Sequence, residues 1–239
     1  MTHVWFIGFL STFAGISAGG LVASCISGFK RSIGTIYAIC TGLILGLISF
    51  ELMPEAIEMG NWIIVAVGFI AGVIVFHYLH EKLESKPMPV KSSEIRGMRM
   101  GIFLALIISI HNFPVGVVLG ASEQSKFSIA LLQALVLHNI PEGMILFTPF
   151  FIAGIRVYLL FLLSVVIAIP VAFGALIGEM IGIQNNLLWA FLISSTIGTI
   201  YMVVIKEILP ESIRQASNHY SLFIAVIAFF MMGIYLLYV

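Results

Sequence analysis

Residues 100–119 read MGIFLALIISIHNFPVGVVL, an apolar stretch that contains the polar motif His111-Asn112-Phe113-Pro114-Val115-Gly116. About 20 apolar residues in an α-helix cross the hydrocarbon core of a bilayer, which is roughly 30 Å thick. The stretch therefore predicts a transmembrane helix, and the motif begins near its middle. An ionisable side chain such as His111 is costly at that depth and by default marks a pathway or a binding site.

Seven further stretches of the chain have a similar length and apolar character. Overall 61% of the residues are hydrophobic and only 9% are charged, whereas a soluble domain carries roughly a quarter of charged residues. We therefore expect an all-α polytopic membrane protein with eight transmembrane helices, forming one transmembrane domain over residues 1–239. This composition excludes a sizeable soluble domain, a nucleic-acid-binding protein and a large enzymatic head group. The other seven predicted spans are Val4–Ile26, Ile33–Met53, Trp62–Leu79, Phe127–Phe147, Val157–Ile177, Leu187–Ile205 and Ser221–Val239.

The basic residues predict the orientation, because cytoplasmic loops are enriched in Lys and Arg. With an external N-terminus, the external loops hold only Lys126 and the cytoplasmic side holds the other ten basic residues. Both termini are then expected outside the cell, in the plasma membrane. The one long polar connection, Glu81–Arg99, is expected to be a cytoplasmic loop. The ten residues are Lys30, Arg31, Lys82, Lys86, Lys91, Arg96, Arg99, Arg156, Lys206 and Arg214.

A second copy of the polar motif, His138-Asn139-Ile140-Pro141-Glu142-Gly143, begins near the middle of the next span. His138 and Glu142 are four residues apart and so share one face of a helix. Imidazole nitrogen and carboxylate oxygen suit borderline divalent cations such as Zn²⁺, and Asn112 and Asn139 can add carbonyl oxygens. A single histidine inside a span is commonly an interhelical hydrogen-bond donor, but two copies with a glutamate in register favour an ion site.

The prolines and glycines of both motifs have their own predicted effects. Pro114 and Pro141 cannot donate backbone hydrogen bonds, so we expect each to interrupt the bonding of its helix, kink the helix and free a carbonyl group beside the histidine. Gly116 and Gly143 leave room for a neighbouring backbone or a hydrated ion.

A second repetition closes the second and the seventh spans. Residues 49–56 read SFELMPEA and residues 205–212 read IKEILPES, so that Glu51 and Glu207 precede a proline in the same way. Because the two spans run in opposite directions, the repetition predicts that spans one to three and six to eight form an inverted pair around spans four and five. Such pairs are associated with alternating access.

These features together resemble the ZIP (Zrt/Irt-like) divalent-metal transporters, most closely the bacterial and GufA-type branch. The resemblance covers the whole chain: eight spans, external termini, a longer cytoplasmic loop after the third span and the tandem histidine motifs. It implies a ZIP-like inverted repeat and uptake of Zn²⁺, with Fe²⁺, Mn²⁺ or Cd²⁺ as further substrates, by an elevator-like movement of spans one, four, five and six. The metal ligands that it implies are His111, Asn112, His138, Asn139 and Glu142.

One position departs from the family pattern. The family has a glutamate that bridges two metal ions where this chain has Val115, and a further glutamate of the sixth span aligns with Val171. One carboxylate, Glu142, then remains beside two imidazoles. We expect a mononuclear site that favours Zn²⁺ over the harder Mn²⁺.

The sequence thus predicts a carrier of divalent metal into the cytoplasm, not an enzyme and without a prosthetic group. Its expected partners are the metal ion and the lipid bilayer, with no nucleic acid, and a homodimer stays open. Two alternatives also stay open: an intramembrane metal-dependent hydrolase with Glu142 as general base, and a metal sensor that does not transport, suggested by Val115. Cys25 and Cys40 lie in apolar stretches and are expected to be buried packing residues, not a disulfide.

Overall fold

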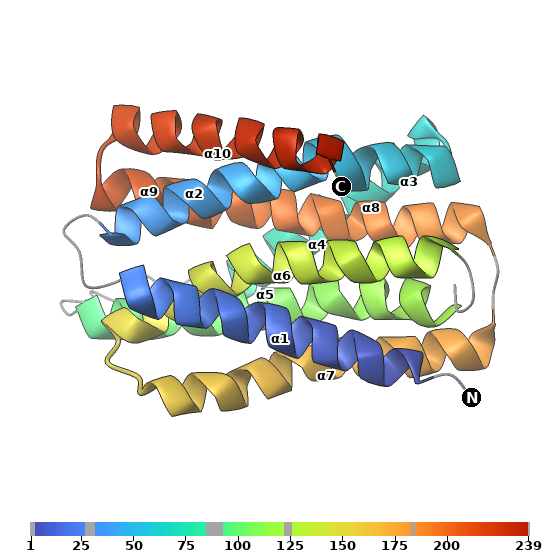
Figure 1. Ribbon diagram of the computed structural model, residues 1–239, viewed down its shortest axis with the longest axis horizontal. Coiled ribbons are helices and arrows are strands. Elements are labelled where there is room, and N and C mark those ends of the chain that lie inside the picture. Colours follow the sequence, from blue (N-terminus) through green and yellow to red (C-terminus); the bar gives the residue numbers. More distant parts are fainter. Residues whose placement is uncertain (1–2, 27–31, 85–92, 122–125, 183–184, 239) are drawn as a thin grey trace.

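The computed structural model describes residues 3–26, 32–84, 93–121, 126–182 and 185–238, and within these ranges it contains helices and no strand (Figure 1). Eight helical segments are long and apolar enough to span a membrane, which confirms the predicted all-α polytopic fold. The helices are α1 (Val4–Ile26), α2 (Ser32–Leu47), η1 (Ile48–Leu52), α3 (Met53–Met59), α4 (Trp62–Glu84), α5 (Ser93–Ala121), α6 (Lys126–Ile152), α7 (Val157–Ile181), α8 (Asn186–Val203), η2 (Val204–Ile208), α9 (Leu209–Gln215) and α10 (Asn218–Tyr238).

Several spans are longer than predicted. The second span continues through η1 and α3 to Met59, the fourth begins earlier and covers Glu94–Ala121, and the seventh continues to Gln215. The predicted loop Glu81–Arg99 is also shorter, because α4 runs to Glu84 and α5 begins at Ser93. Residues 85–92 of that loop lie outside the described residues.

The second and seventh spans share one unusual feature, a π-helical turn in front of a proline. In η1 the amide of Met53 donates to the carbonyl of Ile48, and in η2 the amide of Leu209 donates to that of Val204, both five residues back. Each π turn is followed by a seven-residue helix with proline in its first turn. Local insertions of this kind are frequent at functional sites.

The two spans run in opposite directions, as the inverted repeat requires. In Figure 1, α2 leads to α3 at one end of the molecule and α8 leads to α9 at the other. The hydroxyl of Ser212, in α9, accordingly donates to the carbonyl of Gly34 near the start of α2, at 2.7 Å. The cap residues repeat as well: Asn61 accepts from the first amides of α4, and Asn185 from those of α8.

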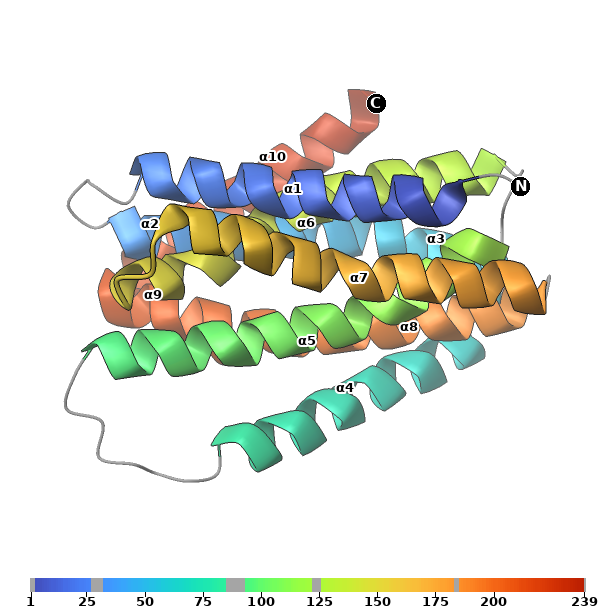
Figure 2. The same cartoon turned by 90° about the horizontal axis from the view of Figure 1, so that it is seen from below.

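The long helices pack as four principal pairs that follow the same symmetry. Helix α1 packs on α6 and α5 on α7, while α4 packs on α8 and α2 on α10 (Figures 1 and 2). The inverted repeat exchanges α1 with α7, α2 with α8, α4 with α10 and α5 with α6. Under this exchange the pair α1–α6 becomes α7–α5, and the pair α4–α8 becomes α10–α2. Contacts inside the set α1, α5, α6 and α7 are more extensive than its contacts with α2 or α8. We call this set the motif bundle and the remaining helices the outer bundle.

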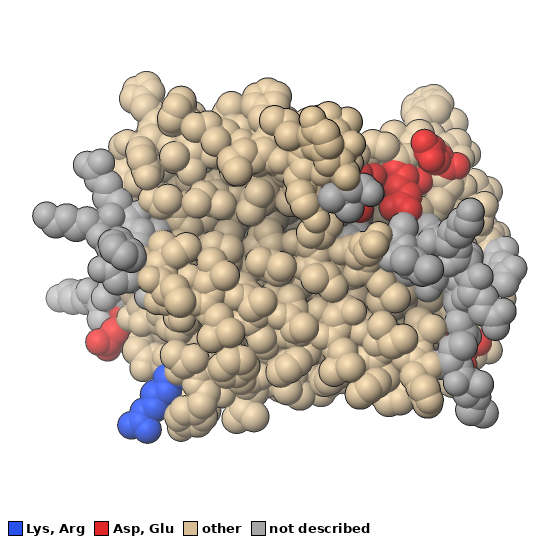
Figure 3. All heavy atoms as spheres, in the orientation of Figure 1, with Lys and Arg blue, Asp and Glu red and all other residues tan. Residues whose placement is uncertain are grey.

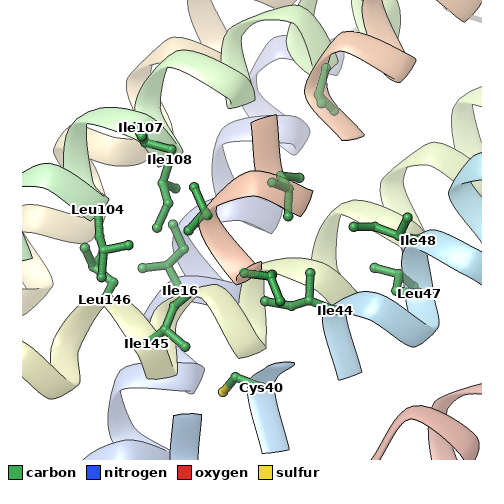
Figure 4. Packing of buried hydrophobic residues seen from close by; sticks show 14 of the residues in the cluster. Ile16, Cys40, Ile44, Leu47, Ile48, Leu104, Ile107, Ile108, Ile145 and Leu146 are labelled. Atoms are coloured by element: carbon green, nitrogen blue, oxygen red, sulfur yellow. The ribbon is translucent and has the colours of Figure 1, made fainter. Parts of the chain in front are cut away.

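Buried aliphatic side chains fill the centre between the two bundles. Ile16 of α1, Ile44 of α2, Ile108 of α5 and Ile145 of α6 belong to one hydrophobic cluster, and Figure 4 shows them close together. Each is at most 2% exposed. The centre of the core therefore draws on α1 and α2 as well as on the two motif helices, α5 and α6.

The outer surface is apolar along the helices and charged towards their ends. Large apolar side chains face outward, such as Ile74 of α4, Leu162 of α7 and Phe223 of α10, with 61%, 60% and 64% of their surface exposed. On the face drawn in Figure 3, the acidic and basic side chains lie near the two ends, with an uncharged belt between them. Such a belt suits lipid tails better than water.

Candidate metal centre

The five predicted ligand residues lie on the packed helices α5 and α6, in the middle third of each helix. All five are buried, with exposed fractions of 4% or less. They are His111 and Asn112 on α5, and His138, Asn139 and Glu142 on α6.

One direct contact joins the two motifs. The Nε2 atom of His111 lies 3.0 Å from the Oε1 atom of Glu142, a hydrogen bond in which the ring N–H donates to the carboxylate. Both side chains are 2% exposed, so the bond is shielded from solvent, and interactions between such groups are strengthened by the low local dielectric. The histidine of the first motif is therefore paired with the glutamate of the second.

His138 stands near the same carboxylate. It lies one helical turn before Glu142, is 4% exposed, and interacts electrostatically with it. The two imidazoles thus approach Glu142 from two helices, His111 from α5 and His138 from α6 itself. Even so, the described residues contain no group of three or more His, Cys, Asp or Glu side chains already arranged to hold a metal ion.

The two asparagines are buried amides. Both are 0% exposed, and neither side-chain amide has a hydrogen-bond partner among the described residues. The same is true of Nδ1 of His111 and Oε2 of Glu142. A buried polar group without a partner costs about 1–3 kcal/mol, so this concentration of them at one place indicates a site built to bind something polar.

The helices stay continuous through the motif prolines, so the predicted interruption is confined to the missing backbone hydrogen bonds. Helix α5 continues through Pro114, and α6 continues through Pro141 and also Pro149. The missing N–H groups still leave the carbonyls of Ile110 and Leu137 without their usual donors. The π turns of the chain lie elsewhere, at η1 and η2.

The motif glycines allow that close packing. A side chain on Gly116 would overlap the carbonyl oxygen of Val171 in α7, and one on Gly143 would overlap that of Ile16 in α1. Of the two uses predicted for these glycines, the structure shows the approach of a neighbouring backbone. Each motif helix is thereby fixed against its own partner helix at the level of the site.

Thr196 of α8 belongs to the site although the sequence did not single it out. Its hydroxyl donates to the backbone carbonyl of His111 at 3.2 Å, which links the outer bundle to the predicted site. The polar run Ser194-Ser195-Thr196 within an otherwise apolar span was the available signal.

Among the described residues, Glu142 is the only buried acidic side chain, so no second buried carboxylate accompanies it. Val115 is 4% exposed and follows His111 by one turn, and Val171 is fully buried against Gly116. The site therefore has two imidazoles, two amides and a single negative charge.

A second histidine–glutamate pair lies at the end of the bundle that holds the basic residues. His80 of α4 lies 3.0 Å, Nε2 to Oε1, from Glu207 in the π turn η2, and its ring packs against Phe76 and Phe103. Glu211, one turn further on, is paired with Arg214. Glu51, the counterpart of Glu207 in η1, is half-buried at the opposite end.

The chain is similar to known proteins over most of its length. Residues 75–239, more than half of the chain, match the family described as ZIP zinc transporter. Three proteins named "Zinc transporter ZupT" are similar throughout. The one from Clostridium perfringens is 27% identical, covering 99% of this chain and 97% of the relative. The one from Streptococcus mutans is 24% identical and covers 98% of this chain and 98% of the relative. The one from Chlorobium chlorochromatii is 25% identical and covers 89% of this chain and 90% of the relative.

Proposed function

Because the chain belongs to the ZIP family of zinc transporters, we propose that it carries Zn²⁺ into the cytoplasm through the buried site on α5 and α6. The ligands are the five residues His111, Asn112, His138, Asn139 and Glu142. The observation that carries the proposal is the contact between His111 and Glu142, which brings a nitrogen and an oxygen donor from different motifs within 3.0 Å of each other. The ZupT proteins, named as zinc transporters, support the choice of metal.

The geometry of that contact suits a metal ion. Bonds from Zn²⁺ to imidazole nitrogen and to carboxylate oxygen are each about 2.1 Å long. With the two donor atoms 3.0 Å apart, an ion bound to both would subtend an angle of about 90°. A small opening of the pair reaches the tetrahedral angle. An arriving ion would replace the proton between His111 Nε2 and Glu142, which is released to solvent, and the two donor atoms need little rearrangement.

The remaining donors complete the coordination. His138 approaches Glu142 from the previous turn of α6, and the two buried asparagine amides supply carbonyl oxygens. A divalent ion with one carboxylate keeps one uncompensated positive charge, and a second ion nearby would be repelled strongly in a medium of low dielectric. We infer a mononuclear site, which relies on imidazole and therefore favours Zn²⁺ over Mn²⁺. Fe²⁺ stands below Zn²⁺ in the same order of affinities and is expected to bind less tightly.

Transport follows from movement between the two bundles. The motif bundle holds every proposed ligand, and its contacts with the outer bundle are fewer than those within it. A sliding of α1, α5, α6 and α7 against the outer bundle would carry the site from one side to the other. The ion then leaves at the end that holds Arg96, Arg156 and Arg214, which the distribution of basic residues assigns to the cytoplasm.

The test is metal uptake by purified protein in liposomes with a zinc-sensitive dye inside. The natural chain should show uptake that Glu142→Gln abolishes, while Glu58→Gln, at an exposed position outside the site, should transport normally. Folded Glu142→Gln that still takes up Zn²⁺ at the natural rate would refute the site. Zinc binding without uptake in the natural chain would instead identify a metal sensor, the role that Val115 suggested.

A further inference from the structure

Two sulfur atoms meet where the two bundles contact each other. The Sγ atom of Cys40, on α2, lies 4.0 Å from the Sδ atom of Met144, on α6. Cys40 is 0% exposed and Met144 is 5% exposed, and the thiol acts as a weak donor towards the thioether. Figure 4 shows the sulfur of Cys40 beside the central aliphatic cluster. This pair is not used by the proposed zinc site.

The distance between the two sulfurs fits a shared metal ion. Thiolate and thioether are soft ligands that select soft metals, Cu⁺ above all. Metal–sulfur bonds are about 2.3 Å long. Two such bonds to sulfurs 4.0 Å apart enclose an angle of about 120° at the metal. One ion can therefore bind both sulfurs while they stay where they are.

The charge of the pair selects a monovalent ion. When the ion binds, the S–H bond of Cys40 breaks, its proton is released to solvent and an S–metal bond forms, so the thiolate cancels one positive charge. A divalent ion would keep one charge at a pair of sulfurs that supplies no further polar donor, unlike the proposed zinc site with its two asparagine amides, and this is unfavourable. The carboxylate of Glu142 does not compensate that charge. Glu142 lies two residues before Met144, about 200° around the helix, and is paired with His111.

We propose that Cys40 and Met144 form a site for a monovalent thiophilic cation, Cu⁺ in chemical class, which joins α2 to α6. Since α2 belongs to the outer bundle and α6 to the motif bundle, a bound ion ties the two together. Occupation therefore inhibits transport, a consequence that rests on the proposed function. The binding itself does not.

Binding is tested with Ag⁺, a redox-stable probe for Cu⁺. The chain has two cysteines, and Cys25 is exposed, so Cys25→Ala serves as the parent protein. Purified parent is incubated with Ag⁺, desalted in buffer with excess imidazole to remove silver held by histidines, and its silver is counted by plasma mass spectrometry. We expect one Ag⁺ per chain, none after the additional change Cys40→Ala, and at least tenfold less after Met144→Leu, which conserves volume.

The methionine variant decides between a two-sulfur site and a reactive thiol. If Met144→Leu retains as much silver as the parent, or if the parent retains none, the proposal is wrong. Because Met144→Leu keeps the thiol and the packing, the test holds even where Cys40→Ala folds poorly.

The inhibitory part is tested in the liposome assay. Stoichiometric Ag⁺ should lower the initial rate of zinc uptake at least fivefold in the Cys25→Ala parent and leave the Met144→Leu variant nearly unaffected. Equal inhibition of both proteins would contradict the tie between the bundles. A parent without zinc uptake would count against the proposed function, whereas the silver count would still decide the site.

Discussion

Gly143 of α6 faces the backbone carbonyl of Ile16 in α1 so closely that a methyl group at Gly143 would overlap the oxygen. Gly116 of α5 faces Val171 of α7 in the same manner. The last residue of each motif is thus a contact point between a motif helix and its partner. Since Glu142 precedes Gly143 directly, the contact also fixes how deep the carboxylate lies in the bundle.

Gly143→Ala is therefore expected to push α6 away from α1. Overpacking of this kind costs about 1–3 kcal/mol, and here the overlapped atom is backbone, which cannot rotate away. We expect a lower melting temperature in detergent and loss of most zinc uptake. Ala66→Val adds two methyl groups at an exposed position of α4 and should leave both properties unchanged. A Gly143→Ala protein with natural stability and uptake would show that the helices separate easily.

The bond from Thr196 to the carbonyl of His111 leads to a second prediction. Thr196→Val removes one buried hydrogen bond, worth about 0.5–1.5 kcal/mol, and releases the α5 backbone at the site. We expect zinc affinity to fall about three- to tenfold, measured by competition with a chelating dye. Thr199→Val is the matched control, since that hydroxyl donates to Gly72 of α4, away from the site. If both variants lowered zinc affinity equally, the loss would come from general disturbance of helix packing and not from the bond to His111.

Val115 gives a third prediction. It lies one turn after His111, as Glu142 lies one turn after His138, so Val115→Glu adds a carboxylate on the face of the first motif. We expect the stoichiometry in calorimetric titration to rise from one Zn²⁺ towards two and Mn²⁺ to be accepted more readily. Val115→Gln has a similar size without the charge and should stay at one ion. Two ions in the natural protein would disprove the mononuclear site.

Orientation supplies a fourth prediction. Glu94 lies at the start of α5 and Glu58 in α3, at opposite ends of the bundle, and both are exposed. In the Cys25→Ala parent, Glu94→Cys should react with a membrane-impermeant maleimide only after the cells are opened, and Glu58→Cys before. The reverse pattern would place the termini inside the cell and invert the direction of uptake.

The sequence was sufficient for the eight spans, because apolar length is a local property. It was not sufficient for the ends of spans two and seven. Glu51 and Pro54 read as a helix end, whereas Glu51 lies in a π turn and Pro54 in the first turn of the helix that follows it. The prediction for Cys25 was wrong for a related reason. It was expected to be buried, whereas the structure leaves it exposed. Composition alone does not separate lipid-facing from core-facing positions.

The site was predictable only in part for a geometric reason. The spacing of His138 and Glu142 placed both on one face of α6, since that depends on one helix. The bond between His111 and Glu142 depends on the relative rotation and height of α5 and α6. These depend on packing between helices, such as the glycine contacts of α5 with α7 and of α6 with α1, and cannot be read from a local sequence pattern. Thr196 was missed on the same ground, because its partner is a backbone carbonyl 85 residues away.

The central claim is that one metal ion binds between the two motifs, and anomalous scattering tests it most directly. Crystals of the natural protein soaked in Zn²⁺ would be measured on both sides of the zinc absorption edge. We predict a single strong peak between the α5 and α6 motifs, within about 2.2 Å of Nε2 of His111 and a carboxylate oxygen of Glu142. No peak there, or two peaks of equal height, would contradict the account.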